Sequence, residues 1–174
     1  MSNVNDFLVA GTMPPMPDML VALYSIPDSR DLAAKLRDAG VVCRRAEAYE
    51  RSVVLDFVSE HFPHWRDEAA VAFARSPATL YVAIEAERVI GFSAYDVVRP
   101  DMFGPTGVDP ACRGRWIGAL LLLKALEALR EERYAYAIIA GVGPAAFYEK
   151  VVGATLIPGS EPGIYEGMLR REGP

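Results

Sequence analysis

The stretch that decides the fold is DPACRGRWIGALLL (109–122), which joins a strand-like segment to an apolar helix. Gly114 and Gly118 let the backbone turn tightly, and the amides that open the helix have no intrahelical acceptor. Those amides, the helix dipole and the guanidinium groups of Arg113 and Arg115 suit a phosphate or pyrophosphate. A tight strand-to-helix connection with solvated arginines fits equally well, so this stretch alone leaves both interpretations open.

The composition around this stretch is that of one globular domain. The chain has 174 residues, of which 52% are hydrophobic, so a substantial core can form. A net charge of -5 without any Lys/Arg run predicts no nucleic-acid partner. The cysteines, Cys43 and Cys112, are too few for a disulfide framework or a zinc cluster, so we expect a reducing compartment and no metal.

The amino terminus carries no export signal of the usual kind. Its first positively charged residue is Arg30, so the basic start of a signal peptide is missing. No apolar run approaches the ~18 residues of a membrane span. We therefore expect a cytoplasmic protein without a membrane partner.

Hydrophobic periodicity predicts a mixed α/β domain. An irregular arm precedes a strand and a helix within residues 1–40, which we treat as an extension of a core over 41–174. Glu87 and Arg88 separate two β-rich runs, which predicts an antiparallel hairpin. The predicted strands are 19–26, 41–46, 79–86, 88–98, 103–108, 135–140, 155–159 and 163–169, and the predicted helices are 30–38, 48–61, 65–75, 117–132 and 143–152, with Pro144 as the first residue of the last helix.

Two motifs resemble one known family. The segment VDPACRGRWIGALL (108–121) resembles the acetyl-CoA signature Q/R-x-x-G-x-G/A of the GNAT superfamily of N-acetyltransferases, with Arg113 first, Gly118 last and Trp116 in place of the first glycine. The segment GPAAFYEKVVGA (143–154) resembles the family's fourth helix, which makes Tyr148 the family's tyrosine. The usual asparagine before this helix is missing.

The resemblance implies a fold and a donor. The fold is a central mixed, mostly antiparallel sheet with helices on both faces, whose fourth and fifth core strands, 103–108 and 135–140, splay apart. The donor is acetyl-CoA. The residues implied to hold it are Val108, Arg113, Gly114, Arg115, Trp116, Ile117, Gly118, Ala119 and Phe147.

The resemblance also implies a direct transfer to a primary amine. The Val108 amide would stabilise the oxyanion and Tyr148 would protonate the leaving thiolate. We expect a small amine or an amino sugar as acceptor, lined by His64, Trp65 and Asp96, and exposed sheet edges are compatible with a homodimer. The general base stays open among Asp96, Glu60, His64, Asp109 and a water relay.

Two alternatives to this enzyme remain. A non-catalytic, CoA-binding or regulatory module would explain both Trp116 and the missing base. The stretch GVGPAA (141–146) also fits the dinucleotide fingerprint G-x-G-x-x-G/A. Fewer than 30 residues follow it, however, which is too short for the remaining strands of a Rossmann unit.

Overall fold

The computed structural model describes residues 16–167 and 169 and is built around one seven-stranded sheet of order β2-β3-β4-β5-β6-β1-β7. Neighbouring strands are antiparallel except for β5 and β6, which are parallel. The predicted mixed, mostly antiparallel sheet is therefore confirmed. The strands are β1 (Met19–Ala22), β2 (Val41–Arg45), β3 (Leu80–Glu85), β4 (Arg88–Tyr95), β5 (Met102–Val108), β6 (Tyr136–Ile139) and β7 (Thr155–Leu156).

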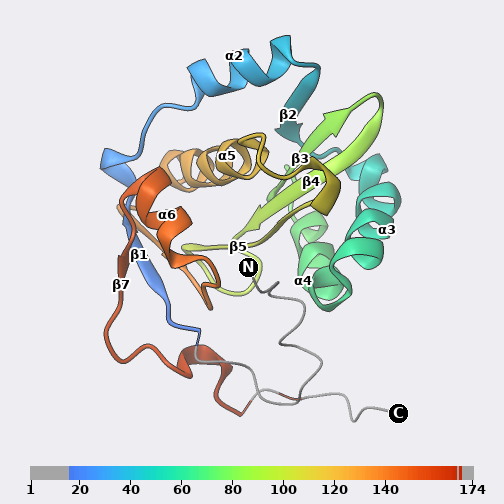
Figure 1. Ribbon diagram of the computed structural model, residues 1–174. Coiled ribbons are helices and arrows are strands. Elements are labelled where there is room, and N and C mark those ends of the chain that lie inside the picture. Colours follow the sequence, from blue (N-terminus) through green and yellow to red (C-terminus); the bar gives the residue numbers. More distant parts are fainter. Residues whose placement is uncertain (1–15, 168, 170–174) are drawn as a thin grey trace.

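Helices cover both faces of the sheet, as predicted (Figure 1). The side chains of α2, α5 and α6 pack in clusters on one face, and those of α3 and α4 pack together on the other. Short 3-10 turns flank several of these helices. The helices are α2 (Arg30–Asp38), α3 (Arg51–His61), α4 (Arg66–Val71), α5 (Ile117–Glu131) and α6 (Ala145–Val152).

Helix α5 is the apolar centre of the fold. Most of its leucines are buried, and burying one such side chain contributes about 1.5–3 kcal/mol. The Ser93 hydroxyl of β4 donates a buried hydrogen bond of 2.9 Å to the Leu121 carbonyl oxygen. Packing against β4 and β5 therefore fixes where the amino-terminal end of α5 lies, and that end carries the predicted anion loop.

Strands β5 and β6 pair over a very short register. The Cα partners are Met102 with Ile138 and Phe103 with Ile139, and no pair follows among the described residues. Gly104 has a φ of 120° and Pro105 has no N–H to donate, so the ladder ends there. Toward their carboxyl ends the two strands are therefore no longer paired. We call this unpaired region, between Val108 on β5 and Gly141 after β6, the strand cleft.

Strand β1 lies inside the sheet although it precedes the expected core. Its Met19 faces Ile139 of β6 on one side and Leu156 of β7 on the other. Val21 and Leu23 are fully buried against α5. The boundary at residue 40 stays a prediction, but a strand from the first forty residues completes the sheet beside the strand cleft.

Several local predictions were wrong. The segment 163–169 is not a strand: Gly163–Tyr165 forms a 3-10 turn, because Pro162 and the positive φ of Gly163 favour a turn, and Met168 lies outside the described residues. The first strand ends at Ala22 and continues as a 3-10 turn. Pro144 caps α6 instead of opening it.

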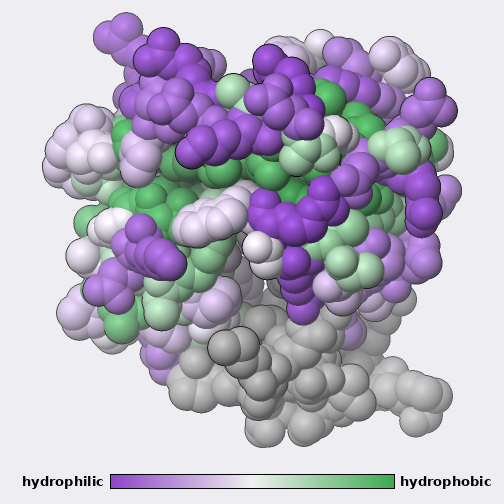
Figure 2. Space-filling view, turned by 45° about the horizontal axis from the view of Figure 1, so that its top comes forward, coloured by the Kyte–Doolittle hydropathy of each residue, from purple (hydrophilic) through white to green (hydrophobic). Residues whose placement is uncertain are grey.

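The surface is mixed in character. Figure 2 shows a band of hydrophobic side chains across one face, bordered by hydrophilic ones. Within residues 16–167, no helix is both long and apolar enough to cross a membrane.

Candidate active site

The predicted anion loop presents free backbone amides at the strand cleft. The Asp109 carboxylate accepts a 2.8 Å hydrogen bond from the Ala111 amide and so shapes the turn after β5. Gly114 has a φ of 80°, which glycine adopts at little cost. The first hydrogen bond of α5 runs from the Leu120 amide to the Trp116 carbonyl oxygen, at 3.1 Å. The amides of residues 117–119 therefore precede the helical ladder and are oriented to bind an anion.

Trp116 has a left-handed backbone conformation, which glycine adopts more easily than other residues. Its φ of 65° and ψ of 7° lie in the left-handed region. Its side chain is 55% exposed, and the Lys150 ammonium of α6 lies 5.4 Å from the ring centroid. The exposed indole thus lies beside Lys150 of α6.

The two arginines of the loop point in different directions. The Arg113 Nε donates to the Val108 carbonyl oxygen at 3.3 Å, so this side chain lies over the end of β5. The Arg115 guanidinium forms a double hydrogen bond with Glu85 on β3, at 2.6 and 3.0 Å. This pair lowers the pKa of Glu85 and ties the loop to the β3–β4 hairpin. Arg113 is therefore the better placed of the two for a ligand in the strand cleft.

Three residues predicted to hold acetyl-CoA meet at one point. A Cβ built on Gly118 would lie 3.6 Å from Val108 Cγ2 and 3.9 Å from Phe147 Cζ. The start of α5, the end of β5 and α6 therefore meet at this glycine, where an added methyl group would make ordinary contacts.

Tyr148 lies on α6 against the diverging strands. Its side chain is 7% exposed and packs edge-on against Phe103 of β5 and against Phe147. This apolar burial raises the pKa of Tyr148 to about 12, so the phenol stays protonated at any ordinary pH. Tyr148 can therefore donate a proton or a hydrogen bond, but it cannot act as a base.

The HFPHW turn (61–65) covers the other face of the strand cleft. The Phe62 ring lies against Gly107 of β5, where a built Cβ would come within 2.6 Å of it. Trp65 stacks on Phe62 with ring centroids 5.5 Å apart, while His64 is exposed on the same 3-10 turn. Of the predicted acceptor residues, Trp65 thus lies behind Phe62 on the face opposite α5 and α6, whereas the structure shows no contact between His64 and β5 within the described residues.

Asp96 does not lie with the other predicted site residues. Gly91 of β4 faces Val108, whereas Tyr95 faces Phe103, so Asp96 is at the far end of β4 from the strand cleft. Its side chain, 5% exposed, pairs with Arg75 at 3.0 Å. We therefore leave Asp96 out of the acceptor site.

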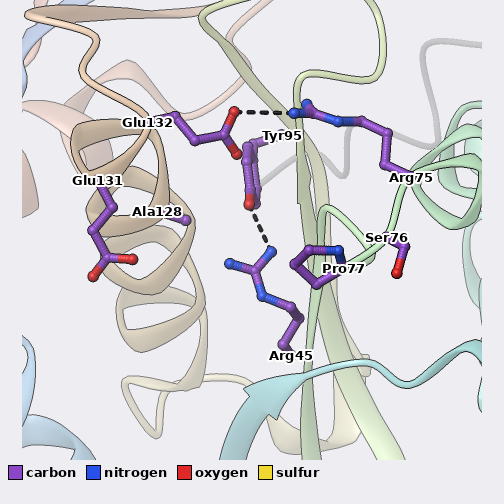
Figure 3. A pocket seen from close by; sticks show the side chains of 8 residues that line it. All are labelled: Arg45, Arg75, Ser76, Pro77, Tyr95, Ala128, Glu131 and Glu132. Atoms are coloured by element: carbon purple, nitrogen blue, oxygen red, sulfur yellow. Dashed lines mark hydrogen bonds and ion pairs between the residues drawn. The ribbon is translucent and has the colours of Figure 1, made fainter.

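A pocket opens near Asp96, and its charged groups are largely paired with protein groups (Figure 3). Arg75 bridges to Glu132 at 3.1 Å, and Arg45 donates to the Tyr95 hydroxyl at 2.6 Å and to the Ala78 carbonyl oxygen at 2.7 Å. These bonds join the β2–β4 side of the sheet to the end of α5. We interpret this pocket as part of the scaffold.

Comparison with known proteins agrees with this geometry. The model of the acetyltransferase (GNAT) family matches residues 46–154, which is more than half of the chain. The chain belongs to the GNAT acetyltransferase family. None of the curated proteins is similar enough to match.

Solved structures show the same GNAT fold at low sequence identity. A glucosamine N-acetyltransferase region of a fungal multi-domain β-N-acetylglucosaminidase superposes with a TM-score of 0.70 at 19% identity, over 88% of this chain and 21% of that one. GNAT proteins from Sphaerobacter thermophilus and Kribbella flavida each give 0.58 at 16% identity over 83% of this chain, and 50% and 55% of theirs. The chain thus spans about a fifth to a half of these proteins, and the likeness establishes the fold alone. Strand β6, antiparallel to β1, also excludes the Rossmann alternative for residues 141–146.

Three residues that the sequence did not single out interact around Gly141 and Tyr165. The Asp18 carboxylate accepts a 2.9 Å hydrogen bond from the Gly141 amide, and Tyr165 packs against Gly141. Burial is the main cause that raises the pKa of Tyr165, and the negative charges of Glu68 on α4 and of Asp18 raise it further. These residues come from three distant parts of the chain, so no local pattern could have grouped them.

The close fit of Phe62 on Gly107 predicts a stability effect. We expect Gly107→Ala to lower the free energy of unfolding by about 1–3 kcal/mol, because the new methyl group must displace a buried ring. Urea denaturation measures this loss. Adding Phe62→Leu should recover part of the stability, and a double variant no more stable than Gly107→Ala alone would contradict the fit.

Proposed function

We propose that this GNAT chain transfers an acetyl group from acetyl-CoA to the primary amine of a small molecule, by direct attack in a ternary complex. The observation that carries the proposal is the convergence of Val108, Gly118 and Phe147 around one gap at the strand cleft, next to the buried Tyr148. The acceptor approaches from the face that the HFPHW turn covers. A small amine or an amino sugar is the favoured acceptor.

The residues at the strand cleft fit acetyl-CoA, whose thioester supplies an activated acetyl group. The amides of residues 117–119 and the Arg113 guanidinium hold the pyrophosphate. The Val108 amide donates to the carbonyl oxygen and stabilises the charge that develops there. Tyr148 gives its proton to the departing sulfur, whose own proton affinity the apolar surroundings also raise.

Donor binding is the first test. We expect calorimetry to give a micromolar Kd for acetyl-CoA and Arg113→Ala to weaken binding about 10- to 100-fold, since a charge-assisted hydrogen bond contributes about 1.5–3 kcal/mol. Arg37→Ala, which removes a charge from the exposed side of α2, is the matched control. If wild type, Arg113→Ala and Arg37→Ala bind acetyl-CoA with equal affinity, Arg113 and its loop are not part of the donor site.

The alternative of a non-catalytic module depends on Trp116. Because the loop backbone already has the glycine-like conformation, we expect Trp116→Gly to change the Kd for acetyl-CoA by less than about 10-fold. If wild type does not bind acetyl-CoA and Trp116→Gly does, the module is favoured. An amine screen that follows release of the CoA thiol, with glucosamine and simple alkylamines among the acceptors, then tests for turnover.

A further inference from the structure

Asp18 brings a carboxylate to the strand cleft. Its Oδ1 accepts the 2.9 Å hydrogen bond from the amide of Gly141, which forms the β6 side of the cleft. Its backbone is held as well. The Ile157 amide donates to its carbonyl oxygen at 2.9 Å, and its own amide donates to Ser160 Oγ at 2.8 Å. These three hydrogen bonds fix the carboxylate at the edge of the cleft.

The Asp18 side chain points to the face of the sheet from which the acceptor approaches. Successive side chains along a strand point to opposite faces. Met19 and Val21 pack in the cluster that contains α5 and α6, so Asp18, which directly precedes Met19, points to the other face. Helices α3 and α4 cover the β3–β4 side of that face, and neither Leu20 nor Ile138 is among the residues that they bury. The face is therefore free of helices where Asp18 lies.

One oxygen of this buried carboxylate is unused. Asp18 is 8% exposed, and an ionised carboxylate can accept about four hydrogen bonds. Within the described residues, the Gly141 amide is its one donor, and no cation pairs with it. In the same part of the chain, the only sealed side-chain polar atom without a partner is Thr79 Oγ1, so Asp18 Oδ2 is open to a ligand. A cation bound there would offset the cost of burying an unpaired charge.

The neighbours of Oδ2 leave room for such a cation. A Cβ built on Gly163 would lie 3.5 Å from Oδ2, so no side chain of residue 163 covers this oxygen. The Tyr165 hydroxyl would lie 3.7 Å from a Cβ built on Gly141, and it forms no hydrogen bond with any described residue. An ammonium group has three donors and can therefore bond to both oxygens at once.

The position of Asp18 suits a positive charge that does not react. The pairing of Phe103 with Ile139 places Gly141 about level with Pro105. Pro105 lies three residues, or about 10 Å, along β5 from Val108, whose amide faces the thioester in the proposed reaction. A carboxylate that bound the reacting nitrogen would also stabilise its protonated form, which cannot attack. A second ammonium group, several bonds from the reacting one, meets neither difficulty.

We propose that Asp18, together with the Tyr165 hydroxyl, binds a second ammonium group of the acceptor, so that this chain acts on diamines in preference to monoamines. This inference rests on the proposed function and narrows its acceptor class. One end of the diamine binds Asp18, and the other end reaches the thioester near Val108. The strand that precedes the expected core thus supplies a substrate-binding residue.

The test compares 1,4-diaminobutane with butylamine, which has the same chain and reacting group but lacks the second charge. In wild type at neutral pH, we expect kcat/KM to be about 10- to 100-fold higher for the diamine, as for other charge-assisted hydrogen bonds. Asp18→Asn keeps an oxygen for the Gly141 amide and removes the charge. It should abolish this preference and change kcat/KM for butylamine by less than about threefold. Tyr165→Phe should reduce the preference by about 2- to 10-fold.

Ser160→Ala separates charge from structural support. It removes the hydrogen-bond acceptor of the Asp18 amide and leaves the carboxylate in place. It should lower the free energy of unfolding, measured with urea, and keep the preference for the diamine. A wild type without this preference, or an equal loss for both amines in Asp18→Asn, overturns the role of Asp18.

Binding without turnover gives an independent measurement. In calorimetry with CoA in place of acetyl-CoA, wild type should bind 1,4-diaminobutane about 10- to 100-fold more tightly than Asp18→Asn does. A wild type that acetylates butylamine but binds the diamine no better than Asp18→Asn does overturns this inference alone. A wild type that binds acetyl-CoA but acetylates neither these amines nor any other amine of the screen overturns the proposed function and this inference with it.

Discussion

Replacing Tyr148 by phenylalanine should lower kcat by about 100- to 1,000-fold while acetyl-CoA binds with unchanged affinity, since general-acid catalysis typically contributes 10²–10⁴-fold. The substitution keeps the ring that packs on Phe103 and Phe147 and removes only the hydroxyl. The leaving thiolate then has no proton donor in an apolar environment. Steady-state kinetics with the best amine of the screen, beside calorimetry, measures both quantities.

Tyr136→Phe is the matched control, because Tyr136 is an exposed tyrosine of β6 that contacts Tyr24. It should keep wild-type turnover. If Tyr148→Phe retains full kcat as well, the hydroxyl takes no part in the reaction and Tyr148 is a packing residue.

Tyr148 also predicts a stability effect at high pH. Its pKa is about 12 in the folded chain against about 10 unfolded, so the unfolded state loses this proton first. The stability that Tyr148 contributes is therefore fully present below pH 10 and is lost as the pH rises toward 12. Above pH 10, the unfolding temperature of Tyr148→Phe should depend less on pH than that of wild type. An identical pH dependence of the two unfolding temperatures would contradict a buried, neutral phenol.

The sequence predicted well wherever local pattern and packing agree. The leucines of 117–132 predicted a buried helix, and α5 is that helix. The charged turn at Glu87 predicted the β3–β4 hairpin, and Pro105 predicted irregular pairing in the strand that now ends beside the strand cleft. Period and turn chemistry are properties of neighbouring residues, so they can be read before the fold is known.

What escaped prediction depends on contacts between distant segments. The place of β1 between β6 and β7 joins residue 19 to residues 139 and 156, and no local pattern specifies such a pairing. Phe62 lies between two helices in the sequence, and no local pattern predicts that its ring packs against Gly107. Tyr165 reaches Gly141 from the end of the chain, and no pattern near either residue predicts that contact.

Gly118 gives the sharpest test of the donor position, because its substitution should separate binding from folding. A methyl group at this position meets Val108 and Phe147 at ordinary contact distances, so the folded chain accepts it. We expect Gly118→Ala to keep the free energy of unfolding or to raise it by up to about 1 kcal/mol, since alanine has a higher helix propensity than glycine. The same methyl group narrows the gap through which the donor passes, so affinity for acetyl-CoA should fall about 10-fold.

A larger side chain should close this gap completely. Gly118→Leu places its branched end between Val108 and Phe147, and acetyl-CoA binding should weaken more than about 100-fold, beyond detection by calorimetry at ordinary concentrations. Thermal unfolding near the wild-type temperature would show that only the ligand's space is lost. If Gly118→Leu folds normally and still binds acetyl-CoA at the wild-type Kd, the donor lies elsewhere. Affinity that falls in the order wild type, Gly118→Ala, Gly118→Leu would instead place the donor at the start of α5, where the absence of a side chain at residue 118 leaves the cleft open.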